Sequence, residues 1–236
     1  MPDREIEPLR YHQFEDDVTR SENLEVFQDL TLRGPDEKRS MLRMALIAHA
    51  NGSWRHASDK EDELSEMAEA DDVIAFERSG GEGIDAVGLV LWAREEGFEI
   101  TNIVPLTVGE LGPRRYNAAL QDFERSVARP AAMEVGFEVQ VTSAQQGPAD
   151  WLPPLATEAL QRFSGAANKA TGSSHPTDRK RWFAFLIAAH RANDLDTDRL
   201  MRWLVEVEGW PEDVAHDLVV QYEFGLALLD EYDGRS

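Results

Sequence analysis

Cysteine is absent from this chain of 236 residues, and basic residues are scarce: 24 Lys and Arg stand against 45 Asp and Glu. Without cysteine the chain has no disulfide, Cys-ligated zinc site, iron–sulfur cluster or catalytic thiol. The formal net charge of −21 repels phosphate backbones, because proteins bind nucleic acids through clusters of Lys and Arg. The main basic cluster is Arg179-Lys180-Arg181. We therefore expect no binding to nucleic acid or to anionic membranes.

Long apolar runs are also missing. No run approaches the roughly 18 residues that indicate a transmembrane helix. The first residues, Met1-Pro2-Asp3-Arg4-Glu5, do not lead into the apolar stretch that is typical of a secretion signal. Hydrophobic residues nevertheless make up 42% of the chain, which is enough for a buried core. These features predict a folded protein of the cytoplasm.

Hydrophobic periodicity predicts a mixed order of strands and helices. Leu24, Phe27 and Leu30, for example, recur at helical spacing, whereas alternating apolar and polar residues predict strands further along the chain. In chain order, the expected elements are a strand at 5–10; helices at 21–30, 35–50 and 59–70; strands at 73–78, 84–94 and 98–104; a helix at 113–127; a strand at 136–143; and helices at 155–169, 176–192, 197–208 and 212–232.

This order predicts an α+β protein in which an antiparallel meander with flanking helices is followed by a C-terminal helical bundle. The clearest internal boundary is residues 143–154, which contain one glycine and three prolines. We expect an α+β sheet domain at 1–146 and a helical domain at 147–236, either independent or packed together as one unit. The sequence leaves the oligomeric state open.

Complete catalytic motifs are missing as well. There is no phosphate-binding Gly-x4-Gly-Lys-Ser/Thr loop, no Gly-x-Ser-x-Gly nucleophile elbow and no His-Glu-x-x-His zinc motif. The acidic run Asp59-Lys60-Glu61-Asp62-Glu63 lacks the spacing of a calcium loop and indicates a solvated helix face. No metal site and no resident cofactor are expected. Whether the chain is an enzyme stays open.

The densest polar segment joins two predicted helices and is the first candidate anion site. A helix N-terminus with free N–H groups attracts phosphate or carboxylate, and basic side chains next to it add to that attraction. Helix capping alone accounts for the same residues, so a structural role is the alternative. The candidate ligand-binding residues are Lys169, Thr171, Gly172, Ser173, Ser174, His175 and Arg179.

The order of elements over residues 5–143 resembles the GNAT N-acetyltransferase fold, which has a strand, two helices, a three-strand meander, a helix and another strand. That family binds the acetyl-CoA pyrophosphate after its fourth strand through Arg/Gln-x-x-Gly-x-Gly/Ala. At the corresponding place this chain reads Val108-Gly109-Glu110-Leu111-Gly112-Pro113-Arg114-Arg115, with glycines and arginines in another order. The resemblance implies a second anion site at Gly109, Gly112, Arg114 and Arg115, with acetyl-CoA as its ligand.

Two functions follow from these observations. The favoured hypothesis is a protein-binding or regulatory module, of the inhibitor or immunity type, whose partner is a basic protein attracted by the acidic surface. Trp210, between Gly209 and Pro211, is the candidate exposed anchor for that partner. The alternative is an enzyme or small-molecule binder for a phosphate-like or CoA-like anion, including a degenerate acetyltransferase.

Overall fold

The computed structural model describes residues 23–68, 72–107, 109–190 and 195–234. Its first part contains β1 (Leu24–Glu25), β2 (Leu30–Arg33), α1 (Arg39–His49), β3 (Trp54–His56), α2 (Ser58–Ala68), β4 (Val73–Arg78), β5 (Val87–Arg94), β6 (Gly97–Pro105), α3 (Pro113–Phe123), a π-helical turn (Glu124–Ala128), α4 (Arg129–Val135), β7 (Glu138–Val141) and β8 (Gln145–Gln146). Its second part contains α5 (Pro148–Trp151), α6 (Pro154–Ala166), α7 (Pro176–Ala189), α8 (Thr197–Arg202), a π-helical turn (Trp203–Val207) and α9 (Glu212–Asp233). The predicted α+β class is confirmed.

The main sheet has six strands in the order β3-β4-β5-β6-β2-β7, and every neighbouring pair is antiparallel. The predicted meander is β4-β5-β6. It ends against β2, which lies between β6 and β7 although it is the first of these six strands in the chain. The predicted strand at residues 5–10 lies outside the described residues.

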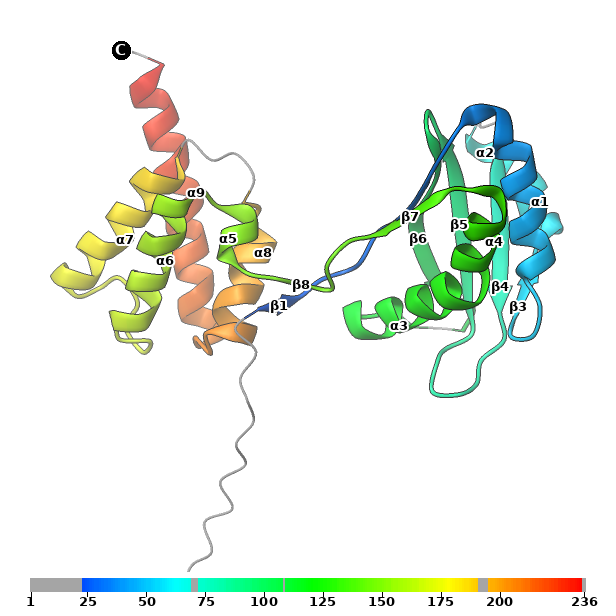
Figure 1. Ribbon diagram of the computed structural model, residues 1–236. Helices are drawn as coiled ribbons and strands as arrows, with labels where there is room; N and C mark the ends of the chain where they lie inside the picture. Colours follow the sequence, from blue (N-terminus) through cyan, green and yellow to red (C-terminus); the bar gives the residue numbers. More distant parts are fainter. Residues whose placement is uncertain (1–22, 69–71, 108, 191–194, 235–236) are drawn as a thin grey trace, which may run out of the picture.

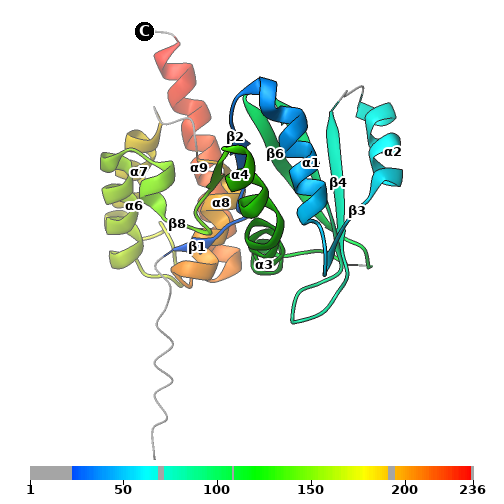
Figure 2. The ribbon, with the colours of Figure 1, turned by 45° about the vertical axis from the view of Figure 1, so that its right-hand side comes forward.

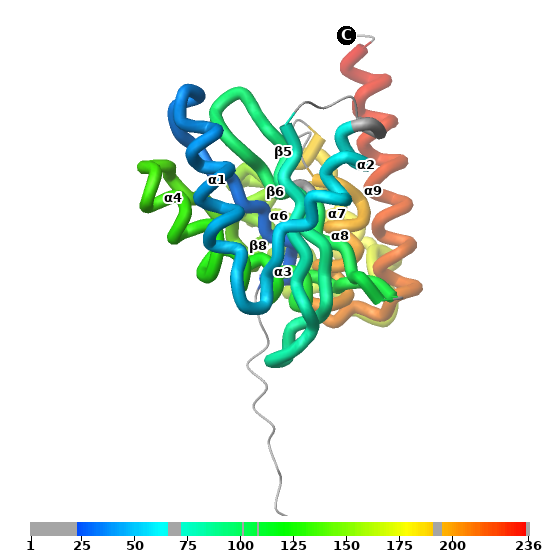
Figure 3. The backbone as a smooth tube through the Cα atoms, turned by 90° about the vertical axis from the view of Figure 1, so that its right-hand side faces the viewer, coloured from blue at the N-terminus to red at the C-terminus, as the bar shows by residue number. Residues whose placement is uncertain are grey.

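The two faces of the sheet are covered by different helices. Along β5, Val87, Leu89 and Leu91 point into a core that also contains side chains of α1, α3 and α4. Gly88 and Val90 alternate with them and face the side of α2. Figures 2 and 3 show α1 and α2 on opposite sides of the sheet. The sheet is therefore the middle layer of the first part.

The predicted helix at residues 21–30 is wrong for its described part, which is extended through β1 to the start of β2. Leu24, Gln28 and Leu30 are buried while the residues between them are more exposed, so the inward period is two. The side chain of Asn117 on α3 holds this segment: it accepts from the Gln28 backbone N–H at 2.9 Å and donates to the Val26 carbonyl at 2.8 Å. These long-range contacts outweigh the weak local preference for a helix.

A second hydrophobic cluster lies within helices α5 to α9, with Phe163, Trp182, Phe185, Trp203 and Trp210 among its aromatic members. The two-stranded ribbon β1/β8 runs between the sheet part and the helical part (Figure 1). Leu24 of this ribbon belongs to the second cluster although it precedes the sheet in sequence. The division at residue 146 stays a prediction.

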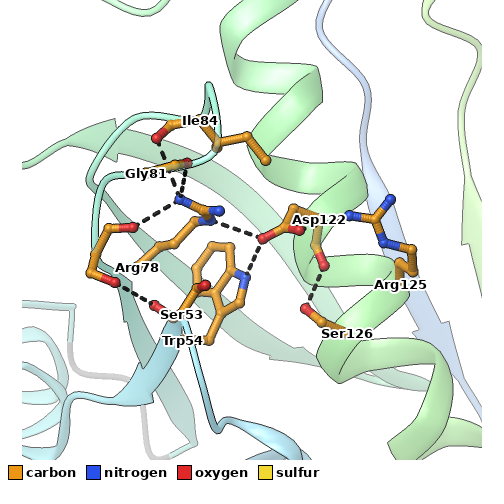
Figure 4. Close-up of polar contacts among 9 residues, drawn as sticks. Ser53, Trp54, Arg78, Gly81, Ile84, Asp122, Arg125 and Ser126 are labelled. Atoms are coloured by element: carbon orange, nitrogen blue, oxygen red, sulfur yellow. Dashed lines mark hydrogen bonds and ion pairs between the residues drawn. The ribbon is translucent and has the colours of Figure 1, made fainter.

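The sheet part also contains a buried charged cluster centred on Arg78, at the end of β4 (Figure 4). The Arg78 side chain is 1% exposed, and its Nε donates to Asp122 Oδ2 on α3 at 2.8 Å. Its terminal nitrogen donates to the carbonyl of Ser79 at 2.8 Å and to those of Gly81 and Ile84 at 3.3 Å. The cluster therefore ties the β4–β5 loop to a helix of the core.

Asp122 receives further donors. Trp54 Nε1 donates to the same carboxylate oxygen at 3.0 Å, and Arg125 donates to the other oxygen at 2.8 Å. Burial by itself raises the pKa of Asp122, but the hydrogen bonds from Arg78 and Trp54 and the charge of Arg78 together hold that pKa below its ordinary value. The ionised form is the one that the fold stabilises.

Candidate functional site

The charged residues of the first candidate anion loop point to partners within the protein. Lys169 donates to the carbonyl of Glu208, and its Nζ lies 3.7 Å from the carboxylate of the same residue and 5.9 Å from the centre of the Trp210 ring. Arg179 donates to the carbonyl of Ser174 at 3.4 Å. The charge of Lys169 is therefore balanced by Glu208, and Arg179, on α7, is hydrogen-bonded to the loop that precedes its own helix.

The polar residues of the same loop border a cavity of about 340 Å³. Thr171, Gly172, Ser173 and Ser174 line it from the loop, and α9 contributes two acidic side chains, Asp213 and Asp217. Lys169, His175 and Arg179 do not line it. Carboxylates thus stand where the anion hypothesis requires positive charge.

The remaining contacts of this loop serve its own structure. Ser173 Oγ is hydrogen-bonded to Gln221 Oε1 on α9 at 2.6 Å, and His175 Nδ1 accepts from the Thr177 backbone N–H at 3.3 Å at the start of α7. Gly172 has φ +57, and a Cβ at this position would lie 3.0 Å from Val214. A positive φ and a close helix explain the glycine without a ligand.

The second candidate anion loop leads into α3. Gly112 is the N-cap residue of α3 and Pro113 is at its first position. Arg115 pairs with Asp85 through two hydrogen bonds of 2.6 and 2.5 Å, and this pairing lowers the pKa of Asp85 below its ordinary value. Arg114 is exposed and forms no ion pair with any residue of the described ranges. Gly109 lies apart from both arginines, on the wall of a different cavity.

Trp210 is not an exposed anchor, so this expectation is corrected. Its side chain is 2% exposed, and it stacks on Phe163 with ring centres 5.3 Å apart. Its indole N–H donates to Ser164 Oγ at 2.8 Å. A tryptophan ring is stable in a core when its apolar surface is buried and its N–H has a hydrogen-bond acceptor, which here is Ser164 Oγ. The side chain of Trp210 therefore lies inside the protein although the residue belongs to the turn between Gly209 and Pro211.

Exposed apolar side chains instead gather in a groove between α7 and α9. The groove has a volume of about 300 Å³. We call it the α7/α9 groove, and its lining residues are Phe183, Leu186, Ile187, Gln221, Phe224, Gly225, Leu228 and Leu229. Ile187 is 65% exposed and Phe224 is 69% exposed. Such a contiguous apolar surface is uncommon on the outside of a protein and is typical of an interaction site.

Both helices are apolar on more than one face, which explains how the groove forms. The inner faces of α7 and α9 pack through residues such as Phe185 and Tyr222, whose stacked rings are 5.7 Å apart. A Cβ at Gly225 would lie 2.7 Å from Leu186, so the glycine lets the helices approach closely. Phe224 and Leu228 then stand beside this contact with no described side chain covering them.

The charge around the groove is strongly asymmetric. Helix α9 carries seven carboxylates and no Lys or Arg. At its C-terminal end, Asp230 and Asp233 lie 3.6 and 3.1 Å from the ring nitrogens of His190. Within α7 itself, Lys and Arg occur only in the first two turns, where Arg181 pairs with Asp178 at 2.6 Å. Helix α9, which forms one wall of the groove, is therefore acidic as a whole, although the residues that line the groove are uncharged.

Comparison of the chain with protein-family models, with curated proteins and with solved structures finds no match. The described residues contain no group of three or more His, Asp or Glu side chains arranged to hold a metal ion. Among the described helices, none combines the length and the hydrophobicity that crossing a bilayer requires. The resemblance to N-acetyltransferases stays a prediction.

Proposed function

We propose that this protein is a protein-binding module and that its binding surface is the α7/α9 groove. The single observation that carries the proposal is the exposed apolar cluster of Phe183, Ile187, Phe224 and Leu228. Burying such side chains stabilises a complex by roughly 1.5–3 kcal/mol each, before the costs of association. Aromatic and aliphatic anchors in a groove are the usual centre of a binding interface.

The occupant we infer is an amphipathic helix with an apolar stripe and basic flanks. A groove between two helices suits the apolar face of a third, with anchor residues three and four positions apart. The seven carboxylates of α9 and the net charge of −21 both favour Lys and Arg on the partner. A second copy of the chain fits less well, because two α9 helices with seven carboxylates each would repel one another.

The test uses a synthetic amphipathic peptide with a leucine stripe and lysine flanks, and its glutamate-flanked counterpart. Fluorescence anisotropy measures the Kd of each for the full chain. We expect the lysine peptide to bind and Phe224→Ser to raise its Kd about tenfold or more, since one buried aromatic contact is lost. Leu155→Ser is the matched control, because Leu155 is exposed on α6 outside the groove.

Three results would contradict the proposal. The lysine peptide does not bind the wild-type chain; the glutamate peptide binds equally well; or Phe224→Ser and Leu155→Ser change the Kd equally. Light scattering on the protein without peptide measures its oligomeric state and so tests whether a second copy of the chain occupies the groove. A dimer that Phe224→Ser converts to a monomer would assign the groove to self-association instead. The predicted cytoplasmic location and the inhibitor or immunity role stay hypotheses, because they depend on the partner's identity.

A further inference from the structure

A third cavity, of about 470 Å³, opens in the sheet part, apart from the α7/α9 groove. Its size is in the range of small-molecule sites. Its walls come from the segment before β2, the end of β6, residues 109–111 and the first turns of α3. Ile103 and Leu111 are buried and give it an apolar floor.

Tyr116 supplies an unpaired polar group to this cavity. Its side chain is 6% exposed, yet its hydroxyl forms no hydrogen bond with any of the described residues. The hydroxyl oxygen is not among the fully enclosed unpartnered atoms, so it is accessible to solvent, and Tyr116 lines the cavity. Phe27 meets the Tyr116 ring edge-on, with centres 5.0 Å apart. A ligand atom at this position can take the place of water as the hydrogen-bond partner of the hydroxyl.

The charge at this cavity is negative. Asp29 and Glu110 line it, and no Lys or Arg from the described part of the chain does. Partial burial raises the pKa of Asp29, and the nearby charge of Glu99 raises it further. Burial raises the pKa of Tyr116 to about 12, and the charge of Asp29 adds to this effect. The negative charge near Asp29 and Tyr116 is therefore not balanced by a described cation at the cavity, and a bound cation would lower the electrostatic repulsion there.

The position of Asp29 is fixed by the backbone. Its N–H donates to Thr142 Oγ1 at 2.8 Å, and the N–H of the preceding Gln28 donates to the Asn117 side chain. The backbone that carries the Asp29 carboxylate at the cavity is thus anchored by two hydrogen bonds. A preorganised acceptor loses less free energy on binding than a mobile one.

We propose that this cavity binds a small organic cation, a primary amine with an apolar body. The ammonium group lies between the Asp29 carboxylate and the Tyr116 hydroxyl, and the apolar body contacts Phe27, Ile103 and Leu111. The inference is independent of the α7/α9 groove. It also reverses the ligand charge expected for the loop that contains Gly109, because Arg115 is paired with Asp85 rather than with the cavity.

The probe is phenethylamine, and 2-phenylethanol is its neutral counterpart of nearly the same shape. Isothermal titration of the full chain measures both. We expect phenethylamine to bind with a Kd in the millimolar range or tighter and the alcohol to bind at least about tenfold more weakly, since a charge-assisted hydrogen bond is lost. This comparison uses the unaltered protein, so it does not depend on any variant folding.

Variants locate the site. Asp29→Asn should raise the Kd of phenethylamine about tenfold, and Tyr116→Phe several-fold, while both bind the lysine peptide as the wild type does. Glu158→Gln, a charge change at an exposed position of α6, is the control for attraction by net charge alone. No binding of the amine, equal binding of the alcohol, or equal effects of Asp29→Asn and Glu158→Gln would overturn the proposal. Loss of peptide binding alone would overturn only the proposed function.

Discussion

The buried cluster around Arg78 makes a strong prediction about stability. Asp122→Asn keeps the shape of the side chain but removes the charge that faces Arg78 at 2.8 Å. Arg78 is 1% exposed, so water cannot replace the lost partner, and its carbonyl contacts in the β4–β5 loop carry no full negative charge. Removing one partner of a buried ion pair costs about 3–5 kcal/mol of folding free energy, because the other charge stays buried.

Urea denaturation followed by circular dichroism measures this cost as a shift of the unfolding midpoint. Glu158→Gln is again the matched control, since it makes the same chemical change at the exposed Glu158–Arg162 pair of α6. We expect that control to cost about 0.5 kcal/mol or less. In the double variant Asp122→Asn/Arg78→Met, part of the loss should be recovered, because no unpaired charge remains buried. If Asp122→Asn costs no more than Glu158→Gln, the assigned role of the cluster is refuted.

Three further predictions follow from individual groups. Because the pKa of Asp122 is lowered in the folded state, its stabilisation is present above its ordinary pKa of about 4 and is lost as pH falls through the folded-state value. In acid denaturation, Asp122→Asn should therefore be less stable than the wild type at neutral pH, and its stability should decrease less steeply as the pH falls. Gly97→Ala should strongly lower the stability measured by thermal denaturation, because the added Cβ would lie 1.8 Å from the Leu32 carbonyl oxygen. By contrast, Gly165→Ala, at an exposed position of α6, should stabilise the protein by up to about 1 kcal/mol. Burial raises the pKa of Tyr222 to about 12, so the stability that this residue contributes is complete below about pH 10 and is lost between pH 10 and 12. In Tyr222→Phe, ultraviolet titration should show one fewer tyrosine that ionises near pH 12, and stability should depend less on pH in this range.

The regular elements could be predicted from the sequence because their signal is local. Strands β4, β5 and β6 are separated by turn sequences, and α1 and α6 each carry an apolar stripe at helical spacing, so their positions follow from the local pattern. The place of β2 in the sheet could not be predicted in this way. Leu30 and Leu32 pair with β6 on one side and β7 on the other, and both partners lie more than 60 residues away in the chain.

The extended segment before β2 shows how two periods compete. Leu24, Phe27 and Leu30 fit a helix, but Leu24, Val26, Leu30 and Leu32 fit a period of two, and the structure follows the second pattern. Gln28 interrupts that apolar series, and it is buried because Thr142 and Gln121 complete its hydrogen bonds. A polar residue whose partners are 90 and more residues away carries no local signal.

The candidate sites were harder to predict than the fold, since each depends on what covers a side chain. Trp210 lies on a turn and is buried, whereas Phe224 lies mid-helix and is exposed. The stripe Val220, Phe224 and Leu228 is visible in the sequence as a second apolar face of α9. Whether another helix covers such a face is decided by packing, so the sequence alone cannot separate core from binding surface.

The distribution of ion pairs explains why both proposed sites favour cations. An anion site on this chain needs Lys or Arg side chains that are free of acidic partners. Arg115 pairs with Asp85, and Lys169 lies beside Glu208, so one basic side chain of each predicted anion loop is paired with an acidic residue of the same protein. At physiological salt, charges interact appreciably only within about 8 Å, so the local surplus governs binding more than the total of −21. Such a surplus lies on helix α9, which forms one wall of the groove, and beside Asp29, next to the apolar residues of the cavity.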